Sequence, residues 1–398
     1  MRILILSSRP PWPPTRADQM TIDRMIRFLS GHGIEVDLAC FVENEAEGRA
    51  VRQELGPLCR RIGIIKLPKW MAYVNTALSL PRQLPMQVGY FTSARMTQMI
   101  REAVATQDYD LVYVHLIRMA EFARDLPVAK VIGLQISQAL NLQRMVENVS
   151  DPARRVFYQV EAAKVRPYEA NVSRDFDKVF LIGQRDIDEI SKTVPLTNAV
   201  IQPHGQDVPA AGLVEQARRE PGAIVMSGVM GTYTNVDAAT WFAQDVFPIV
   251  ERAVPEASFW IVGRQPQRDV LALARDDRIV VTGEVDNVND YLLRAEVGVA
   301  PLRIGAGMQN KLVQAMAAGL PVVATPVANE GIQARDVEHV WLRDEPRAFA
   351  DAVITLLRNR GARERLGASA RAFAEKYWTW DAHFEQQLNV FEEVAHKQ

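Results

Sequence analysis

A glycine-containing loop between a buried strand and a helix is the segment best suited to bind an anion. Residues 297–302 form an apolar run typical of a buried strand, and the chain then turns through Gly305 and Gly307 into a helix that we expect over 311–318. Glycine lets backbone N–H groups approach an anion without hindrance from a Cβ atom. The helix start adds unpaired N–H donors and a partial positive charge, and Lys311 adds a full charge, so a diphosphate would fit there. The alternative is a tight turn followed by a solvated lysine.

Two other strand ends carry residues that suit the same site. The apolar run 259–262 is followed by a glycine and Arg264, and the run 223–226 is followed by a serine and Gly228. The carboxyl ends of parallel strands meet at one edge of a sheet, where ligands of such sheets bind. We therefore expect Arg264 to add a second positive charge near Lys311.

The first half of the sequence offers two candidates for proton transfer or substrate orientation. His115 comes just past a strand expected over 111–114, and the alternative is a packed histidine bonded to a backbone carbonyl. Asp18 lies with Arg16 in the loop after the first strand, where it could accept a proton. The alternative is that Asp18 caps a helix beginning near Met20.

Composition excludes several classes of protein. The chain has 398 residues, of which 48% are apolar and 24% charged, as in a globular protein with a sizeable core, and the length suggests two domains. With 46 basic and 48 acidic residues the net charge is -2, which argues against a nucleic-acid-binding protein. The six histidines show no metal-ligand spacing, so we expect no metal site.

Sequence features also predict the cellular compartment. Cys40 and Cys59 form no C-x-x-C pair and indicate free thiols in a reducing cytoplasm. No apolar run approaches the roughly 18 residues that span a bilayer, and the N-terminus lacks the features of a signal peptide. We therefore expect a cytoplasmic protein.

A repeated alternation of strands and helices predicts an α/β fold with two doubly wound domains. The first βαβ unit comprises a strand over 3–6, a helix ending near Gly31 and a strand over 34–41. We assign residues 1–200 to an N-terminal domain and 201–379 to a C-terminal domain, because residues 201–209 resemble a hinge and a second α/β rhythm follows them. The tail, 380–398, is expected to form a helix that packs back on the N-terminal domain.

The second half of the sequence resembles the retaining glycosyltransferases of family four. The resemblance covers about 223–380, and the variant at 303–311 resembles the branch of bacterial exopolysaccharide sugar transferases. It implies the GT-B fold, in which two Rossmann-like domains face a cleft. The matching segments, in order, are SGVM at 227–230, NVDA at 235–238, WF at 241–242, FP at 247–248, IVGR at 261–264, VVTGEV at 280–285, PLR at 301–303, NK at 310–311, AMAAGLPVVAT at 315–325 and EGI at 330–332.

By that resemblance, Arg264 and Lys311 would neutralise the diphosphate of a nucleotide-sugar donor. Backbone N–H groups near Gly307 and Met308 would assist them, with Gly228 in the same site.

The resemblance also places the nucleoside. Val285 would lie beside the base, and Gln314 falls where the family carries a glutamate that holds the ribose hydroxyls. The usual pair of acids, spaced eight apart, would fall on Ala306 and Gln314, and neither is acidic. Glutamine can still accept one ribose hydrogen bond, but the loss of charge could weaken binding by about 1–2 kcal/mol.

The activity implied is sugar transfer from a UDP- or GDP-sugar, with retention of configuration, to a glycan or a polyprenyl-diphosphate-linked acceptor. Such a hexosyltransferase would act in exopolysaccharide or cell-surface glycan biosynthesis and would need no cofactor beyond its donor. Asp18 and His115 would serve the acceptor side. The alternatives are a non-catalytic nucleotide-sugar-binding subunit and another GT-B enzyme such as a sugar-nucleotide epimerase.

The segment 66–88 combines aromatic, apolar and basic residues. Trp70 and Tyr73, flanked by Lys66 and Lys69, could contact a membrane surface and place the protein on the inner face of the cell membrane. The interpretation that we favour from the sequence is an insertion packed on the core, because aromatic-rich helices more often face a core.

Overall fold

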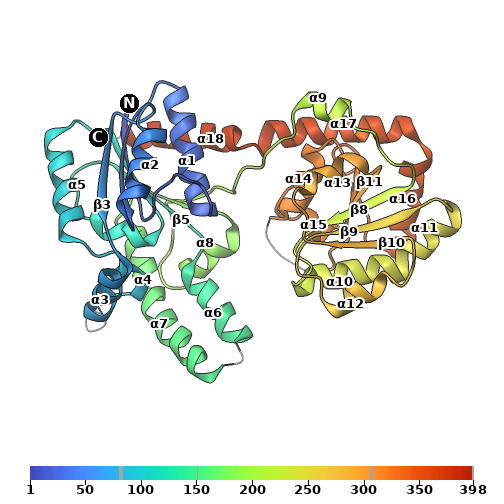
Figure 1. Ribbon diagram of the computed structural model, residues 1–398, viewed down its shortest axis with the longest axis horizontal. Helices are drawn as coiled ribbons and strands as arrows, with labels where there is room; N and C mark the ends of the chain where they lie inside the picture. Colours follow the sequence, from blue (N-terminus) through green and yellow to red (C-terminus); the bar gives the residue numbers. More distant parts are fainter. Residues whose placement is uncertain (80–83, 150, 305–307, 397–398) are drawn as a thin grey trace. The chain divides into compact units, whose positions relative to one another are not determined.

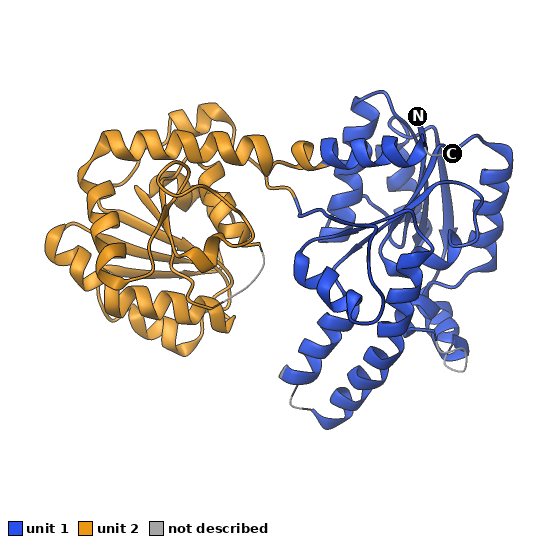
Figure 2. Cartoon of the chain, turned by 180° about the vertical axis from the view of Figure 1, so that it is seen from behind, with its two compact units in different colours: residues 1–204, 384–398 blue, residues 205–383 orange. Residues whose placement is uncertain are grey.

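A computed structural model describes residues 1–79, 84–149, 151–304 and 308–396 of the chain. The chain divides into two compact units (Figure 2). Unit 1 comprises residues 1–204 and 384–398, and unit 2 comprises residues 205–383.

Unit 1 is built on a seven-stranded parallel sheet in the order β3-β2-β1-β4-β5-β6-β7, with helices beside it (Figure 1). The order reverses between β1 and β4, which is where such sheets bind ligands. Its elements are β1 (Arg2–Ser7), α1 (Ala17–Gly31), β2 (Glu35–Val42), α2 (Glu45–Leu55), β3 (Arg61–Lys66), α3 (Lys69–Ser79), α4 (Met86–Tyr90), α5 (Ala94–Thr106), β4 (Leu111–His115), a 3₁₀ segment (Ile117–Phe122), β5 (Lys130–Gln135), α6 (Gln138–Asn148), α7 (Pro152–Arg174), β6 (Lys178–Leu181), α8 (Gln184–Ser191) and β7 (Ala199–Ile201).

Unit 2 is built on a six-stranded parallel sheet in the order β10-β9-β8-β11-β12-β13. Together with unit 1 it forms the pair of Rossmann-like domains predicted from the sequence. Its elements are α9 (Ala211–Glu215), β8 (Ala223–Ser227), α10 (Tyr233–Trp241), a π-helical segment (Phe242–Val246), α11 (Phe247–Ala253), β9 (Ser258–Val262), α12 (Arg268–Leu273), β10 (Ile279–Gly283), α13 (Val288–Arg294), β11 (Val297–Ala300), α14 (Asn310–Ala317), β12 (Val322–Ala324), α15 (Pro326–Asn329), β13 (Trp341–Leu342), α16 (Pro346–Arg358) and α17 (Arg360–Tyr377).

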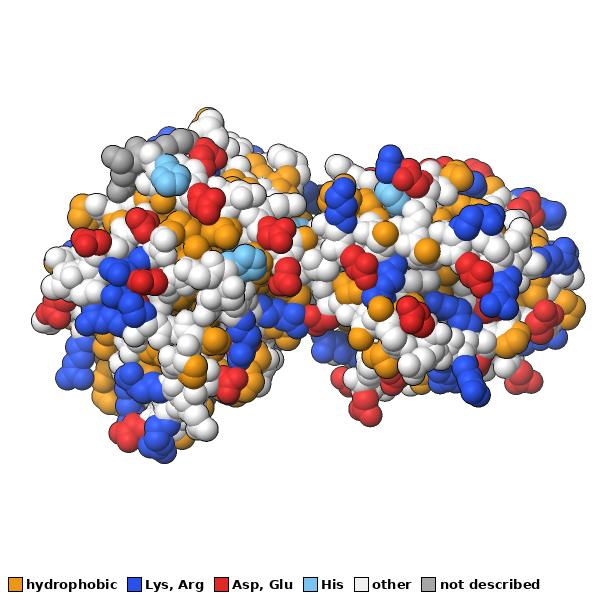
Figure 3. Space-filling view, turned by 90° about the horizontal axis from the view of Figure 1, so that it is seen from above, with side chains coloured by type: hydrophobic (Ala, Val, Ile, Leu, Met, Phe, Trp, Pro, Cys, Tyr) orange, Lys and Arg blue, Asp and Glu red, His pale blue; other side chains and the backbone are white. Residues whose placement is uncertain are grey.

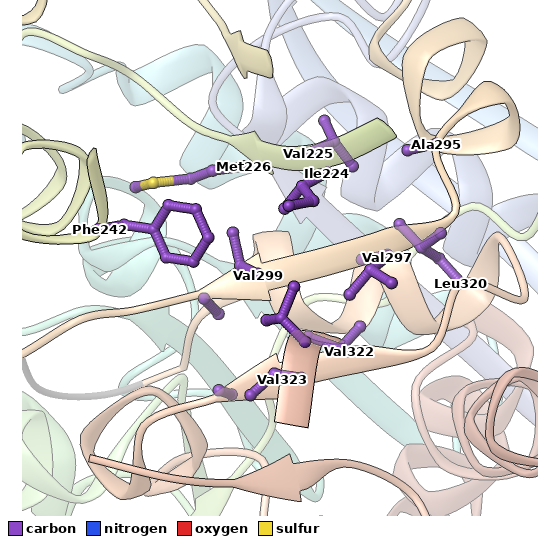
Figure 4. Close-up of a cluster of buried hydrophobic side chains, with 14 of the residues drawn as sticks. Ile224, Val225, Met226, Phe242, Ala295, Val297, Val299, Leu320, Val322 and Val323 are labelled. Atoms are coloured by element: carbon purple, nitrogen blue, oxygen red, sulfur yellow. The ribbon is translucent and has the colours of Figure 1, made fainter. Parts of the chain in front are cut away.

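The core of unit 2 explains why its strands are continuous apolar runs. Val297 and Val299 of β11 lie between Ile224 of β8 and Val322 of β12, and Phe242 packs over the same layer (Figure 4). These side chains are almost fully buried, as expected for strands covered on both faces. The core fixes the strands whose carboxyl ends carry the candidate site.

The last helix, α18 (Trp380–Ala395), carries the chain from unit 2 into unit 1. Within unit 1 the ring of Phe384 lies 5.6 Å from that of Phe28, and the ring of Phe391 lies 5.6 Å from that of Tyr113. The end of the chain is therefore part of the core of unit 1.

Helix α3 differs from the interpretation favoured on sequence. Trp70 and Tyr73 are each 66% exposed and Leu78 is 65% exposed, whereas the small Ala72 and Ser79 are buried. The insertion is therefore not packed on the core through its aromatic residues, because the narrow face that touches the domain consists of small side chains. None of the described helices is both long enough and apolar enough to cross a bilayer.

Charged side chains of both signs are distributed over the surface. On the face that Figure 3 shows, basic and acidic side chains lie among one another on both units. The pattern agrees with the nearly balanced count of 46 basic and 48 acidic residues.

Candidate active site

A pocket of about 500 Å³ lies in unit 2 where β8, β9 and β10 end and α14 begins. It is the edge of the sheet predicted to bind an anion. The side chains and loops that line it are Ser227, Gly228, Val229, Thr232, Thr234, Asn235, Val262, Gly263, Arg264, Glu284, Val285, Val288, Met308, Gln309, Asn310, Lys311 and Gln314.

Two glycines bring the strand ends together. The Gly228 N–H donates to the Val262 carbonyl at 3.0 Å, and the Gly263 N–H donates to the Gly283 carbonyl at 3.2 Å. A Cβ atom on Gly263 would lie 1.8 Å from the carbonyl oxygen of Gly228, which no side chain could tolerate. The loops after β8 and β9 therefore approach each other at backbone distance and leave the pocket open above them.

Lys311 lies in the first turn of α14, and its ammonium donates to the side-chain oxygen of Asn235. The Asn235 amide in turn donates to the Val229 carbonyl at 2.9 Å, so the asparagine is held in place from the far side. Burial lowers the pKa of Lys311 to about 8. Among the described residues no carboxylate forms an ion pair with Lys311. A half-buried ammonium without an acidic partner is suited to bind an anionic ligand.

The structure brings nearly all the predicted donor-site residues to this pocket. Gly228, Arg264, Val285 and Met308 line it with Lys311. Gln314 lines it too, and its amide lies 3.5 Å from the Asn289 side-chain oxygen. Gly307 and Ala306 lie outside the described residues.

Sequence reasoning missed two polar residues of the pocket. Asn235 was part of the segment that carries the resemblance, but its contact with Lys311 joins positions 76 residues apart. Glu284 lies directly before Val285 and is the one carboxylate among the described residues that line the pocket. Glu284 could have been predicted from the sequence, because it directly follows the Thr-Gly pair that ends β10.

A second group of polar residues gathers in unit 1 where β1 and β4 end. His115 is the last residue of β4 rather than the residue after it, and it pairs in the sheet with Ser7. Its side chain is buried, its Nδ1 lies 3.3 Å from the Tyr113 hydroxyl, and its Nε2 has no hydrogen-bond partner among the described residues. Burial lowers the pKa of His115 to about 3, so the ring is neutral near pH 7.

Asp18 belongs to the same group, but its position differs from both interpretations of the sequence. It lies in the first turn of α1, and the N-cap is Arg16, because the helix begins earlier than expected. Arg9 Nη1 donates to Asp18 Oδ2 at 2.6 Å. Burial by itself would raise the pKa of Asp18, but the charge and hydrogen bond of Arg9 outweigh it and hold the pKa below its ordinary value. The carboxylate also interacts electrostatically with His115 and Arg118.

The four proposed catalytic residues thus form two pairs, each within one unit. Asp18 and His115 lie together in unit 1, and Arg264 and Lys311 line one pocket in unit 2. The sequence missed Arg9 and Arg118, the two arginines beside Asp18. No group of three or more candidate metal ligands occurs in the described part of the chain.

Comparison with known proteins supports this description of unit 2. Residues 222–359 match the family described as Glycosyl transferases group 1. A phosphatidyl-myo-inositol mannosyltransferase of Mycobacterium leprae is 25% identical over 369 residues, which cover 87% of this chain and 90% of that protein. A 44.6 kDa protein from the cps region of Klebsiella pneumoniae is 19% identical over 94% of this chain and 96% of its own length.

Solved structures show the same two-domain fold. A sucrose-phosphate synthase from Thermosynechococcus elongatus superposes with a TM-score of 0.63 and 17% identity, over the full length of both chains. Anabaena HepE in complex with UDP superposes with a TM-score of 0.61 and 13% identity, over 99% of this chain and 100% of that one. The chain therefore has the GT-B fold, and its match to the glycosyl transferases group 1 family lies within unit 2, over residues 222–359.

Proposed function

We propose that the chain transfers a sugar from a UDP- or GDP-sugar to a glycan or lipid-linked acceptor, with retention of configuration, in the assembly of exopolysaccharide or another cell-surface glycan. The observation that carries the proposal is the meeting of Arg264 and Lys311 in one pocket beside the glycine-bearing strand ends. Two cations in a pocket of about 500 Å³ suit a nucleoside diphosphate.

Lys311 would stabilise the diphosphate as the sugar leaves. Negative charge grows on the departing phosphate in the transition state, and a fixed cation that is already desolvated interacts with it more strongly than a solvated one. The contact with Asn235 holds the ammonium without neutralising it. Arg264, which is exposed at the mouth of the pocket, would supply the second charge.

Val285, Gln314 and Glu284 would hold the nucleoside. Val285 offers an apolar surface to the base, and Gln314 would accept a hydrogen bond from a ribose hydroxyl. Position 314 carries a glutamine and therefore no carboxylate, but Glu284 supplies a carboxylate in the same pocket.

On the acceptor side we assign orienting roles to His115 and Asp18. A neutral imidazole can accept a hydrogen bond from a substrate hydroxyl, and the free Nε2 is available for one. Asp18 is charged and paired with Arg9, so it would orient rather than remove a proton while that pair is intact. In a retaining transfer without a protein nucleophile, positioning and electrostatic stabilisation are what the side chains contribute.

The relatives suggest which donors to test first. One Mycobacterium tuberculosis relative, 34% identical over 152 residues, is named as a GDP-mannose-dependent mannosyltransferase, and Anabaena HepE has been solved in complex with UDP-glucose. The match to the mycobacterial mannosyltransferase covers only 39% of that enzyme, and HepE is only 13% identical to this chain. GDP-mannose and UDP-glucose therefore both belong in the panel, and neither is favoured.

The test is titration calorimetry with UDP and GDP, followed by turnover measurements with a panel of UDP- and GDP-sugars that includes UDP-glucose and GDP-mannose. We expect one nucleotide to bind and its sugar to be hydrolysed slowly or transferred. Binding without turnover of any donor, with every acceptor offered, would favour a non-catalytic nucleotide-sugar-binding subunit. No binding of either nucleotide would refute the assignment of the pocket.

We also propose a cytoplasmic location, because free thiols suit a reducing compartment. Cys40 and Cys59 are free thiols, both buried, and burial raises the pKa of each to about 12, which keeps them protonated and unreactive.

A further inference from the structure

A larger pocket, of about 830 Å³, lies in unit 1 at the carboxyl ends of its strands. Its wall includes Arg9 after β1, Glu43 after β2, Leu67 after β3 and Arg118 after β4. It therefore occupies the position at which a parallel sheet binds its ligand. The roles assigned above use none of its volume.

Part of the lining of this pocket is basic. Arg9, Arg16 and Arg118 line it, and among the described residues the neighbouring carboxylate of Asp18 forms an ion pair with Arg9. The Arg118 guanidinium lies 5.9 Å from the Phe91 ring, and among the described residues it has no ion pair. Burial lowers the pKa of Arg118 to about 10, so it remains charged near pH 7.

The acids on the same wall are already engaged. Glu43 pairs with Lys69 at 3.0 Å, and Glu47 accepts hydrogen bonds from the Glu43 N–H and from the Asn44 amide at the start of α2. Glu47 keeps its charge, so four basic side chains (Arg9, Arg16, Lys69 and Arg118) face three acidic ones (Glu43, Glu47 and the neighbouring Asp18), which leaves an excess of one positive charge.

Another part of the lining is aromatic, and it meets the basic part where Phe91 lies beside Arg118. Tyr73, Tyr90, Phe91 and Phe157 line it, from α3, α4 and α7. The rings of Tyr73 and Tyr90 meet edge to face with centroids 5.8 Å apart, and those of Tyr90 and Phe91 are 4.9 Å apart. One pocket thus joins a site for an anion to a site for an apolar chain.

The aromatic part of the lining continues onto the exposed faces of two helices. Figures 1 and 2 show α3, α4 and α7 at one end of unit 1, and the Met86 N–H of α4 donates to Glu161 of α7 at 2.7 Å. On this end, which we call the apolar rim, large hydrophobic side chains are exposed. They are Trp70, Met71, Tyr73, Val74 and Leu78 of α3 and Val156, Phe157 and Val160 of α7.

We propose that this pocket binds a lipid phosphate: Arg118, Arg16 and Arg9 hold the phosphate or diphosphate, and the apolar rim contacts its hydrocarbon chain at the membrane surface. The inference rests on the proposed function, in which this lipid carries the sugar acceptor. An amphiphile accounts for both the basic and the aromatic part of the lining with one molecule. Three exposed basic residues, Lys66 before α3 and Arg154 and Arg155 at the start of α7, suit an interface with phosphate headgroups, and two of them now pair with acids, Lys66 with Glu45 and Arg154 with Asp151.

The experiment measures co-sedimentation of the full chain with phosphatidylcholine vesicles, alone, with phosphatidylglycerol or with a polyprenyl diphosphate. Soluble pyrophosphate is titrated in parallel. We expect tight binding only where the polyprenyl diphosphate is present, and weak binding of pyrophosphate alone. Equal binding to phosphatidylglycerol vesicles would show that general anionic attraction is responsible and would overturn the specific site.

Variants test the contributions of the arginines and of the apolar rim separately. Arg118→Gln should weaken binding to polyprenyl diphosphate vesicles by about tenfold or more, because a charged hydrogen-bonding partner is lost. Arg118→Lys should restore part of it. The double variant Trp70→Gln, Leu78→Gln should lose vesicle binding and keep pyrophosphate binding. Leu271→Gln, which changes a 51% exposed leucine of unit 2, is the matched control and should bind like the parent chain.

Three results would contradict the inference. The first two are vesicle binding that is unchanged in Arg118→Gln and vesicle binding that is unchanged in the double variant. The third is a parent chain that is a dimer and becomes a monomer in the double variant, which would show that the apolar rim binds a second copy of the chain. Nucleotide binding is measured on each sample. If the parent chain binds nucleotide but not the polyprenyl diphosphate vesicles, this site alone is refuted. If the parent chain binds the vesicles but not nucleotide, the proposed function is refuted.

Discussion

The ammonium of Lys311 is held by the side-chain oxygen of Asn235, and the asparagine is itself held by the Val229 carbonyl. The contact ties the start of α14 to the start of α10, across the pocket that follows β8 and β9. A neutral partner fixes the position of the lysine and leaves its charge free for a ligand.

Lys311→Ala should weaken the binding of the preferred nucleotide diphosphate by about tenfold to a hundredfold, as expected for the loss of a charged hydrogen bond. Calorimetry measures the change. Lys376→Ala removes an exposed lysine of the same unit on α17 and serves as the control. Unchanged affinity in Lys311→Ala would remove Lys311 from the donor site.

Nucleotide affinity should fall as the pH rises above about 8. Burial lowers the pKa of Lys311 to about 8, and a diphosphate prefers the protonated amine, so deprotonation above this pH removes the attraction. The loss should approach about tenfold per pH unit well above the pKa if the charge is essential. Lys311→Arg, which stays charged, should have a flatter profile between about pH 7 and 10. Parallel profiles for the two proteins would contradict the assignment.

Gly263→Ala should destabilise unit 2 and weaken nucleotide binding. The added Cβ would lie 1.8 Å from the Gly228 carbonyl oxygen, so the two strand ends must separate. We expect a loss of about 3 kcal/mol in the free energy of unfolding, the upper end of the range for overpacking. Denaturant unfolding measures it, and Gly31→Ala, where nothing lies within 4 Å of the added atom, is the control.

His115 should reduce stability as the pH falls. Burial lowers its pKa to about 3, whereas the unfolded chain has the ordinary value near 6.5, so between these values the unfolded state binds more protons. The contribution of this site to the free energy of unfolding therefore falls as the pH drops below about 6.5. In His115→Asn the pH dependence over this range should be shallower. An imidazole that NMR shows protonated at pH 5 would contradict the argument.

Gln314→Glu should bind the nucleotide as tightly as the parent or up to about tenfold more tightly, because a carboxylate makes a stronger hydrogen bond to a ribose hydroxyl. Gln314 lines the pocket, so the new charge faces the ligand. Calorimetry with the nucleoside and the nucleoside diphosphate separates the ribose contact from the phosphate contact. A severe loss with both ligands would show that Gln314 does not face the ribose.

The main buried strands followed from the sequence, because apolar runs such as 259–262 and 297–302 are determined by local residue type, whereas β3, β7 and β13 were not predicted. The meeting of Arg264 and Lys311 in one pocket, which we propose as the donor site, has a related reason. In a parallel sheet the carboxyl ends of all strands share one edge, so Arg264 after β9 and Lys311 after β11 must lie near each other once both strands join one sheet.

Only the tertiary structure decided the partners and the environment of single side chains. Asn235 and Lys311 are 76 positions apart, and Arg118 is 109 positions from Arg9, so no local pattern links them. Sequence could not say that Trp70 and Tyr73 of α3 remain largely exposed, because burial depends on what packs against a helix. Sequence therefore determined the main buried strands, and only the assembled chain fixed which charges are paired, which are buried and which apolar side chains remain exposed.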